Sequence, residues 1–319
     1  MVPLNYSDPE GQTAAIALIR IKANVSTDSP EYRGPVIHNP GGPGGSGIDN
    51  ILQYGQKMAR TLGPQFDIVT FDPRGVSRST PKVSYFNTSL DRQSWMVSAP
   101  QELNNLEDVG TAWARSKIEG QLAGDVLPDI LPHIQTDHTA RDMLRIVEAH
   151  GRDKIQYWGI STWLHVEWAD TVDIANFKDF LLDADEALKW FFKDCHAAGP
   201  ELCAFYEESP EAIEERLNRL YDSVKQAPVP ASYNTLALEA GNGTLYATPE
   251  SPQNPCDVNP WEEAFGNVQD AAVAIRCNDG DIVPPDLEDA QKHYEEITQV
   301  SEWGSVLAVW RIACRHVLL

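Results

Sequence analysis

A serine at the end of a hydrophobic segment is the first residue of this sequence that could do chemistry. Tyr157–Gly159 is followed by Ile160 and Ser161, so the chain reads G-x-S directly after a short strand-like run. A sharp turn from strand to helix exposes such a serine as a nucleophile, and the N–H of the next residue, Thr162, becomes an oxyanion donor. The usual turn has a second glycine, where this chain has Trp163. A tryptophan there crowds the helix against the strand.

A glycine-rich segment, His38–Gly47, lies earlier in the chain between a strand-like and a helix-like segment. Its backbone N–H groups can converge on one anion, which is either a phosphate or the oxyanion of acyl transfer. No Gly-Lys-Ser/Thr follows and the glycines do not space as G-x-G-x-x-G, so the sequence disfavours the phosphate. A purely structural glycine turn is the other alternative. We take Gly41 and Gly42 as candidate oxyanion donors.

A third motif, Asp72-Pro73-Arg74-Gly75, directly follows the apolar run at residues 66–71. Such a turn can hold Arg74 against carboxylates at the edge of a sheet, although by itself the pattern favours an ordinary surface ion pair. We expect Asp72, Arg74, His38 and Gly159 to support the site structurally. In particular, Gly159 allows close approach of the backbone before Ser161.

The segments between these motifs predict the elements that position them. We expect a strand, helix, strand, helix and strand at residues 34–40, 48–63, 66–72, 136–151 and 154–161, preceded by a further strand within 13–25. The first helix should end at Gly63, and the second should have Thr136 or Asp137 as its N-cap. Strands and helices that alternate in this way predict a parallel α/β sheet.

Beyond Asp183 the pattern changes to amphipathic helices separated by linkers rich in Pro, Gly and Asn. We therefore predict two regions: an α/β core at residues 1–182 and a helical, cap-like region at 183–319.

Composition excludes several function classes. The 319 residues carry a net charge of −22, which disfavours binding to nucleic acid and to anionic membrane surfaces. No apolar run is long enough for a transmembrane helix, and the first residues do not read as a signal peptide. The five cysteines match no zinc pattern, so we expect no metal and no cofactor. The sequence does not indicate an oligomeric state.

Two features bear on the compartment and leave it open. Sequons for N-glycosylation begin at Asn5, Asn24, Asn87 and Asn242, yet such triplets also arise by chance. Cys195 and Cys203 bracket a Gly-Pro loop that a disulfide could close in an oxidising compartment. Scattered buried thiols are an equally good interpretation.

Taken in order, these motifs resemble the α/β-hydrolase fold. They are similar more narrowly to the proline iminopeptidase and tripeptidyl aminopeptidase family, in its secreted fungal and actinobacterial branch. The segments that carry the resemblance are His38–Gly44, Asp72–Gly75 and residues 137–161, and it continues through 181–206 and 274–281. It implies a mostly parallel sheet with a helical cap, and an extracellular serine exopeptidase that cleaves peptide or small amide or ester bonds through an acyl-enzyme.

The family's triad follows the order Ser…Asp…His, with the acid and base on loops after later core strands. The sequence ends at "VWRIACRHVLL", so we expect that this C-terminal catalytic part is missing. The remaining histidines and aspartates do not read as substitutes, and we expect surface or structural roles for His165, His196, His293, His316, Asp279 and Asp281.

Three hypotheses remain open. The first is an active serine hydrolase of peptidase type, or a related ester or amide hydrolase acting on a small molecule in a biosynthetic pathway. The second is a catalytically impaired remnant that lacks the triad Asp and His and keeps little activity. The third is an interaction protein that uses its acidic helical half.

Overall fold

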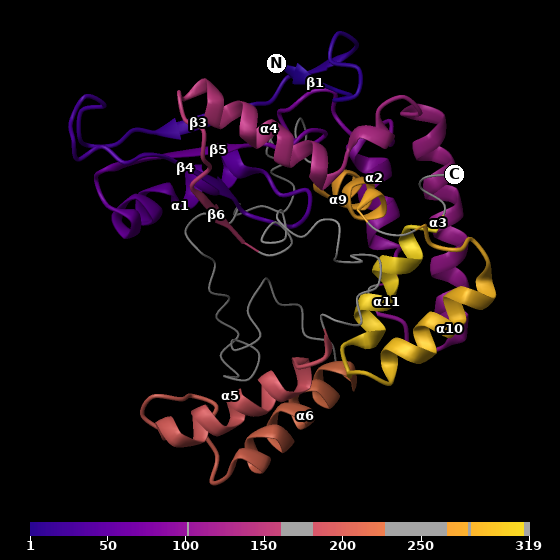
Figure 1. Cartoon of the computed structure of the whole chain (residues 1–319). Coiled ribbons are helices and arrows are strands. Elements are labelled where there is room, and N and C mark those ends of the chain that lie inside the picture. The colour runs from indigo at the N-terminus through magenta and orange to yellow at the C-terminus, as the bar shows by residue number, and fades with distance from the viewer. Residues whose placement is uncertain (101, 161–180, 227–266, 280–281, 316–319) are drawn as a thin grey trace. The chain divides into compact units, whose positions relative to one another are not determined.

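The computed structural model describes residues 1–100, 102–160, 181–226, 267–279 and 282–315 (Figure 1). The chain divides into two compact units, which are described separately below. The first unit comprises Met1–Asp179 and Pro260–Leu319, and the second comprises Phe180–Asn259. None of the helices in the described residues is long and apolar enough to cross a membrane.

A four-stranded sheet forms the centre of the first unit, in the order β3 (Leu18–Ile21), β5 (Phe66–Phe71), β4 (Gly34–Asn39), β6 (Tyr157–Gly159). β4 is parallel to both β5 and β6, and β3 runs antiparallel along the edge. The predicted mostly parallel sheet is therefore confirmed. The strand expected within residues 13–25 is divided, because Thr13–Ala14 (β2) pairs instead with Val2–Pro3 (β1).

Two helices cover opposite faces of this sheet (Figure 1). Successive side chains of a strand point to opposite faces. Ile68 of β5 therefore packs toward α1 (Gly47–Leu62), whereas Val69 and Phe71 pack toward α4 (Thr136–Ala149). The result is the layered α/β core that the alternation of elements predicts.

The ends of the two helices are fixed by different means. α1 begins where the Ser46 hydroxyl accepts a hydrogen bond from Asp49 N–H, and it ends at Gly63 as predicted. The predicted N-cap of α4 is wrong, because Thr136 lies inside the helix. Its backbone N–H instead donates to the Asp279 carboxylate at 2.7 Å. The cap of α4 thus comes from a distant part of the chain.

The remaining helices of the first unit come from two parts of the chain. They are α2 (Ser89–Val97), α3 (Leu106–Val126), the short 3-10 helix η1 (Leu131–His133), α9 (Val268–Asn278), α10 (Leu287–Thr298) and α11 (Gly304–Ala313). Ile275 of α9 packs in one cluster with Val76 and Val83, next to the Asp72–Gly75 turn. These contacts group α9–α11 with the first unit, although the sequence suggested a cap for all of 183–319. The boundary at residue 182 stays a prediction.

The second unit is described at residues 181–226 and contains the helices α5 (Ala184–Ala198) and α6 (Pro210–Gln226). Phe192, Phe205 and Ile213 form their common core. A disulfide joins Cys195 to Cys203 and closes the Gly-Pro loop between them. Of the two alternatives that the sequence allowed, a disulfide or free buried thiols, the structure has the disulfide.

The ion pair between Arg74 and Asp142 is fully buried, with no exposure of either side chain. The guanidinium donates to both carboxylate oxygens, at 2.8 and 2.6 Å, and to the carbonyls of Leu4 and Pro3. The Tyr6 hydroxyl donates to the same carboxylate at 2.8 Å. The expectation of a surface ion pair is therefore wrong. Arg74 is buried because the N-terminal hairpin and α4 supply enough acceptors to replace water.

We expect Arg74→Met to lower the free energy of unfolding by about 3–5 kcal/mol, because it leaves the Asp142 carboxylate buried and unpaired. Urea denaturation followed by circular dichroism measures the change. Arg145→Met removes an exposed ion pair with Glu148 and should change stability by less than about 0.5 kcal/mol. If Arg74→Met does not fold, Arg74→Met/Asp142→Leu should fold better, since it removes both charges. Equal stability of Arg74→Met and Arg145→Met would contradict this role.

Asp279 gives the stability a pH dependence. Burial raises the pKa of its carboxyl from 3.8 to about 6. The two hydrogen bonds from Thr136 lower this pKa, but burial has the larger effect. The folded pKa exceeds the unfolded one, so the folded state binds more protons between these values and the free energy of unfolding falls as pH rises through them. Asp279→Asn keeps an oxygen acceptor for Thr136 N–H and removes the titration. Between pH 4 and 7 the free energy of unfolding of the wild type should fall by about 2 kcal/mol relative to that of this variant. Parallel stability curves for the two proteins would refute the assignment.

Candidate active site

The carboxyl ends of β4 and β6 place two candidate segments side by side. The strands are parallel and pair His38 with Trp158 and Asn39 with Gly159. Ile160 N–H also donates to the Asn39 carbonyl, at 3.2 Å. The glycine loop, residues 40–46, and the segment toward Ser161 therefore leave the sheet at the same edge. Ser161, Thr162 and Trp163 lie outside the described residues.

His38 joins three elements at this edge. Its Nδ1 lies 2.9 Å from the Trp158 carbonyl on β6, and its Nε2 lies 2.9 Å from Asn50 Oδ1 on α1. A carbonyl oxygen only accepts, so the first contact requires a proton on Nδ1. The ring is almost fully buried. This position fits the supporting role predicted for His38.

The two candidate oxyanion donors of the glycine loop differ in their hydrogen bonds. Gly41 is buried, and its N–H donates to Asn39 Oδ1 at 2.9 Å. Gly42 is exposed, and its N–H has no acceptor in the part of the chain that the structure describes. Of the two N–H groups, that of Gly42 is free to bind an anion. Asn39, which fixes Gly41, was not singled out from the sequence.

Asp72 connects this loop to the turn after β5. Its Oδ1 accepts from the Ser46 hydroxyl at 2.6 Å and from Ile48 N–H at 3.2 Å, and its Oδ2 accepts from Arg78 N–H at 3.2 Å. The carboxylate is fully buried at the N-terminus of α1, where the helix dipole favours negative charge. Asp72 thus anchors the first turn of α1 directly after the glycine loop. Ser46 and Arg78 were also missed from the sequence. Ser46 has a local signal, since it stands three residues before Asp49 at the start of a helix, whereas nothing local marks Arg78.

Close approach of the backbone explains one glycine of the loop and the first glycine of α1. A Cβ on Gly44, whose φ is +91°, would lie 2.4 Å from the Val268 carbonyl. A Cβ on Gly47 would lie 2.2 Å from the Phe71 carbonyl. The loop is therefore pressed against α9 on one side and against the end of β5 on the other.

The described residues considered as substitutes for the triad's acid and base have other contacts. Asp279 binds Thr136 at the start of α4. His196 belongs to the second unit, where it contacts the Glu207 carbonyl and stacks on Tyr206. His293 is buried on α10. Outside the described residues lie His165, Asp281 and His316. Within the described ranges, no cluster of His, Cys, Asp and Glu could hold a metal ion.

The geometry of this edge agrees with the family that the sequence matches. Residues 34–162 match the family model described as alpha/beta hydrolase fold. The chain is 35% identical over 161 residues to serine protease Hip1 of Mycobacterium tuberculosis, across 50% of this chain and 30% of the relative. It is 35% identical over 169 residues to tripeptidyl aminopeptidase of Streptomyces lividans, across 50% and 29%. A shorter match, 41% over 81 residues, is to carboxylesterase B of M. tuberculosis, across 25% and 15%.

Residues 34–162 match the α/β-hydrolase fold, which confirms the predicted fold, and the resemblance to tripeptidyl aminopeptidases is confirmed over half of this chain. The matched part spans less than a third of the length of these relatives.

The contact between the glycine loop and α9 predicts the effect of a single methyl group. Gly44→Ala should lower the free energy of unfolding by about 1–3 kcal/mol, because it strains the backbone and displaces the Val268 carbonyl. Gly110→Ala, on α3, meets nothing within 4 Å and should stabilise the protein by about 0.5–1 kcal/mol. Thermal or urea unfolding of both variants measures the difference. A Gly44→Ala protein as stable as the wild type would contradict the contact.

Proposed function

We propose that this chain carries the nucleophile and the oxyanion site of a serine hydrolase of peptidase type. One observation carries the proposal: the N–H of exposed Gly42, which has no acceptor among the described residues, follows β4, while the adjacent parallel strand β6 leads within two residues to Ser161. A nucleophile and an oxyanion donor must flank the same carbonyl, and neighbouring strand ends provide that arrangement.

In the proposed reaction, Ser161 Oγ attacks the carbonyl carbon of an amide or ester, and the carbonyl oxygen becomes negatively charged. The N–H groups of Gly42 and Thr162 donate to this oxygen. The N-terminus of α1, held by Asp72, adds a favourable dipole. Collapse of the intermediate expels the amine or alcohol and leaves an acyl-enzyme, which water then hydrolyses. The hydroxyl proton of Ser161 passes to a general base, which is not among the described residues of this edge.

We further propose that the substrate is a peptide and that cleavage is of the exopeptidase type. The similarity to a serine protease and to a tripeptidyl aminopeptidase supports this choice. The shorter match to a carboxylesterase favours the alternative, a small ester or amide. An extracellular location and glycosylation stay predictions.

A fluorophosphonate probe tests the nucleophile, since it labels only serines that are activated for attack. The folded wild-type chain should be labelled, and Ser161→Ala should give no label above background. Ser223→Ala, which alters an exposed hydroxyl bonded within its own helix, should be labelled like the wild type. A folded wild type without label would overturn the proposal and favour the catalytically impaired remnant.

A further inference from the structure

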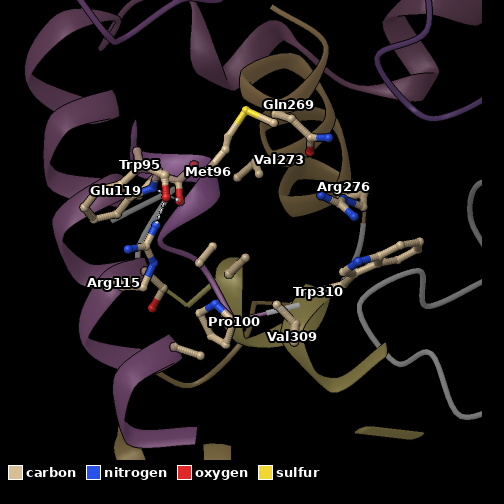
Figure 2. Close-up of a pocket in the computed structure, with 14 residues that line it drawn as sticks. Trp95, Met96, Pro100, Arg115, Glu119, Gln269, Val273, Arg276, Val309 and Trp310 are labelled. Atoms are coloured by element: carbon tan, nitrogen blue, oxygen red, sulfur yellow. Dashed lines mark hydrogen bonds between the residues drawn. The ribbon is translucent and has the colours of Figure 1, made fainter. Parts of the chain in front are cut away.

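A cavity of about 210 Å³ lies within the first unit, between α2, α3, α9 and α11 (Figure 2). Its walls combine indole rings, guanidinium groups and apolar side chains, among them Trp95, Met96, Arg115, Val273, Arg276 and Trp310. No residue of the glycine loop lines it. The cavity is thus separate from the candidate active site.

Arg276 is the unusual residue of this cavity. The residue is 8% exposed, and its Nε donates to the Ala272 carbonyl of the same helix. Its terminal nitrogens have no acceptor among the described residues, and the guanidinium points into the cavity (Figure 2). It lies 4.7 Å from the centre of the Trp310 ring. Burial lowers the pKa of Arg276 to about 10. The donors of these terminal nitrogens are therefore available to an anion that enters the cavity.

The other charged groups of the cavity already have partners. The Glu119 carboxylate accepts from the Tyr85 hydroxyl at 2.6 Å and from Trp95 Nε1 at 3.3 Å. Burial raises the pKa of Glu119. Its charge acts on Arg276 and favours the protonated guanidinium, but no hydrogen bond joins the two side chains. Arg115 stacks on the Trp95 ring at 3.8 Å and donates to the Ser98 hydroxyl and the Trp95 carbonyl. Arg276, whose terminal nitrogens have no acceptor among the described residues, therefore has the most donors left for a ligand.

The cavity's frame is held in place before any ligand binds. Arg92 of α2 forms a buried ion pair with Asp270 of α9, with nitrogen–oxygen distances of 3.0 Å. A disulfide between Cys277 and Cys314 joins α9 to the end of α11. A preorganised site loses little conformational entropy on binding.

We propose that this cavity binds a small organic carboxylate with an apolar or aromatic body. The planar fork of Arg276 matches a carboxylate in a bidentate pair, and the apolar and aromatic walls favour an organic anion over an inorganic one. The indoles of Trp95 and Trp310 and the side chains of Met96 and Val273 contact the body of the ligand. The volume is below the roughly 300–1,000 Å³ of sites for drug-sized molecules, so the ligand is about the size of a single ring with a short acid chain. This proposal goes beyond the proposed hydrolase activity and does not depend on Ser161.

Three probes test the proposal by calorimetry and thermal shift on the full chain. Phenylacetate should bind and raise the melting temperature. Phenylacetamide has the same shape without the charge and should bind about 10- to 100-fold more weakly, the range expected when hydrogen bonds to a charged group are lost. Acetate has the charge without the ring and should also bind more weakly. No binding of phenylacetate at millimolar concentration, or equal binding of phenylacetate and either of the other two probes, would overturn the proposal.

Variants separate a ligand-binding arginine from a structural one. Arg276→Met should weaken phenylacetate binding by about 10- to 100-fold and leave the melting temperature nearly unchanged, because the side chain makes only one hydrogen bond, within its own helix. A clear loss of stability in Arg276→Met would identify a structural role instead and refute the proposal. Arg145→Met, on an exposed face, should bind like the wild type. Ser161→Ala should also keep binding, so failure of the hydrolase proposal and failure of this one are distinguishable.

Discussion

The buried ion pair of Arg74 and Asp142 is the constraint on which the first unit depends. It joins the turn after β5 to α4, and through the carbonyls of Pro3 and Leu4 it also fixes the start of the chain. Removing both charges from water costs several kcal/mol for each ion, and such a pair is tolerated only when its remaining donors are satisfied. Here backbone carbonyls and the Tyr6 hydroxyl satisfy them. The pair therefore specifies one arrangement of hairpin, turn and helix.

The same turn also determines the geometry of the candidate site. Asp72, two residues before Arg74, holds Ser46 and the start of α1, and so sets where the glycine loop meets the helix. A change in the turn would move both the core ion pair and the anchor of the loop. The stability of the first unit and the position of the Gly42 N–H thus both depend on the Asp72–Gly75 turn.

Local patterns predicted the parts of the fold that local physics determines. The order of strands and helices and the end of α1 at Gly63 follow from periodicity and from glycine's freedom at a helix end. Because parallel strands share an edge, the proximity of the glycine loop to the segment before Ser161 also followed. The cap of α4 could not be predicted from a local pattern, because Asp279 lies 143 residues away from Thr136 in the chain. The burial of Arg74 likewise depends on tertiary contacts that no short segment encodes.

α9 shows why such contacts matter for function. One side of the helix presses on the glycine loop, where the Val268 carbonyl leaves no room for a side chain on Gly44. Another side carries Arg276 into the cavity. The ion pair of Arg92 with Asp270 and the disulfide at Cys277 hold the helix in place. A close-packed helix of this kind cannot shift on one face without shifting on the other. The position of the loop therefore depends on residues that never touch it.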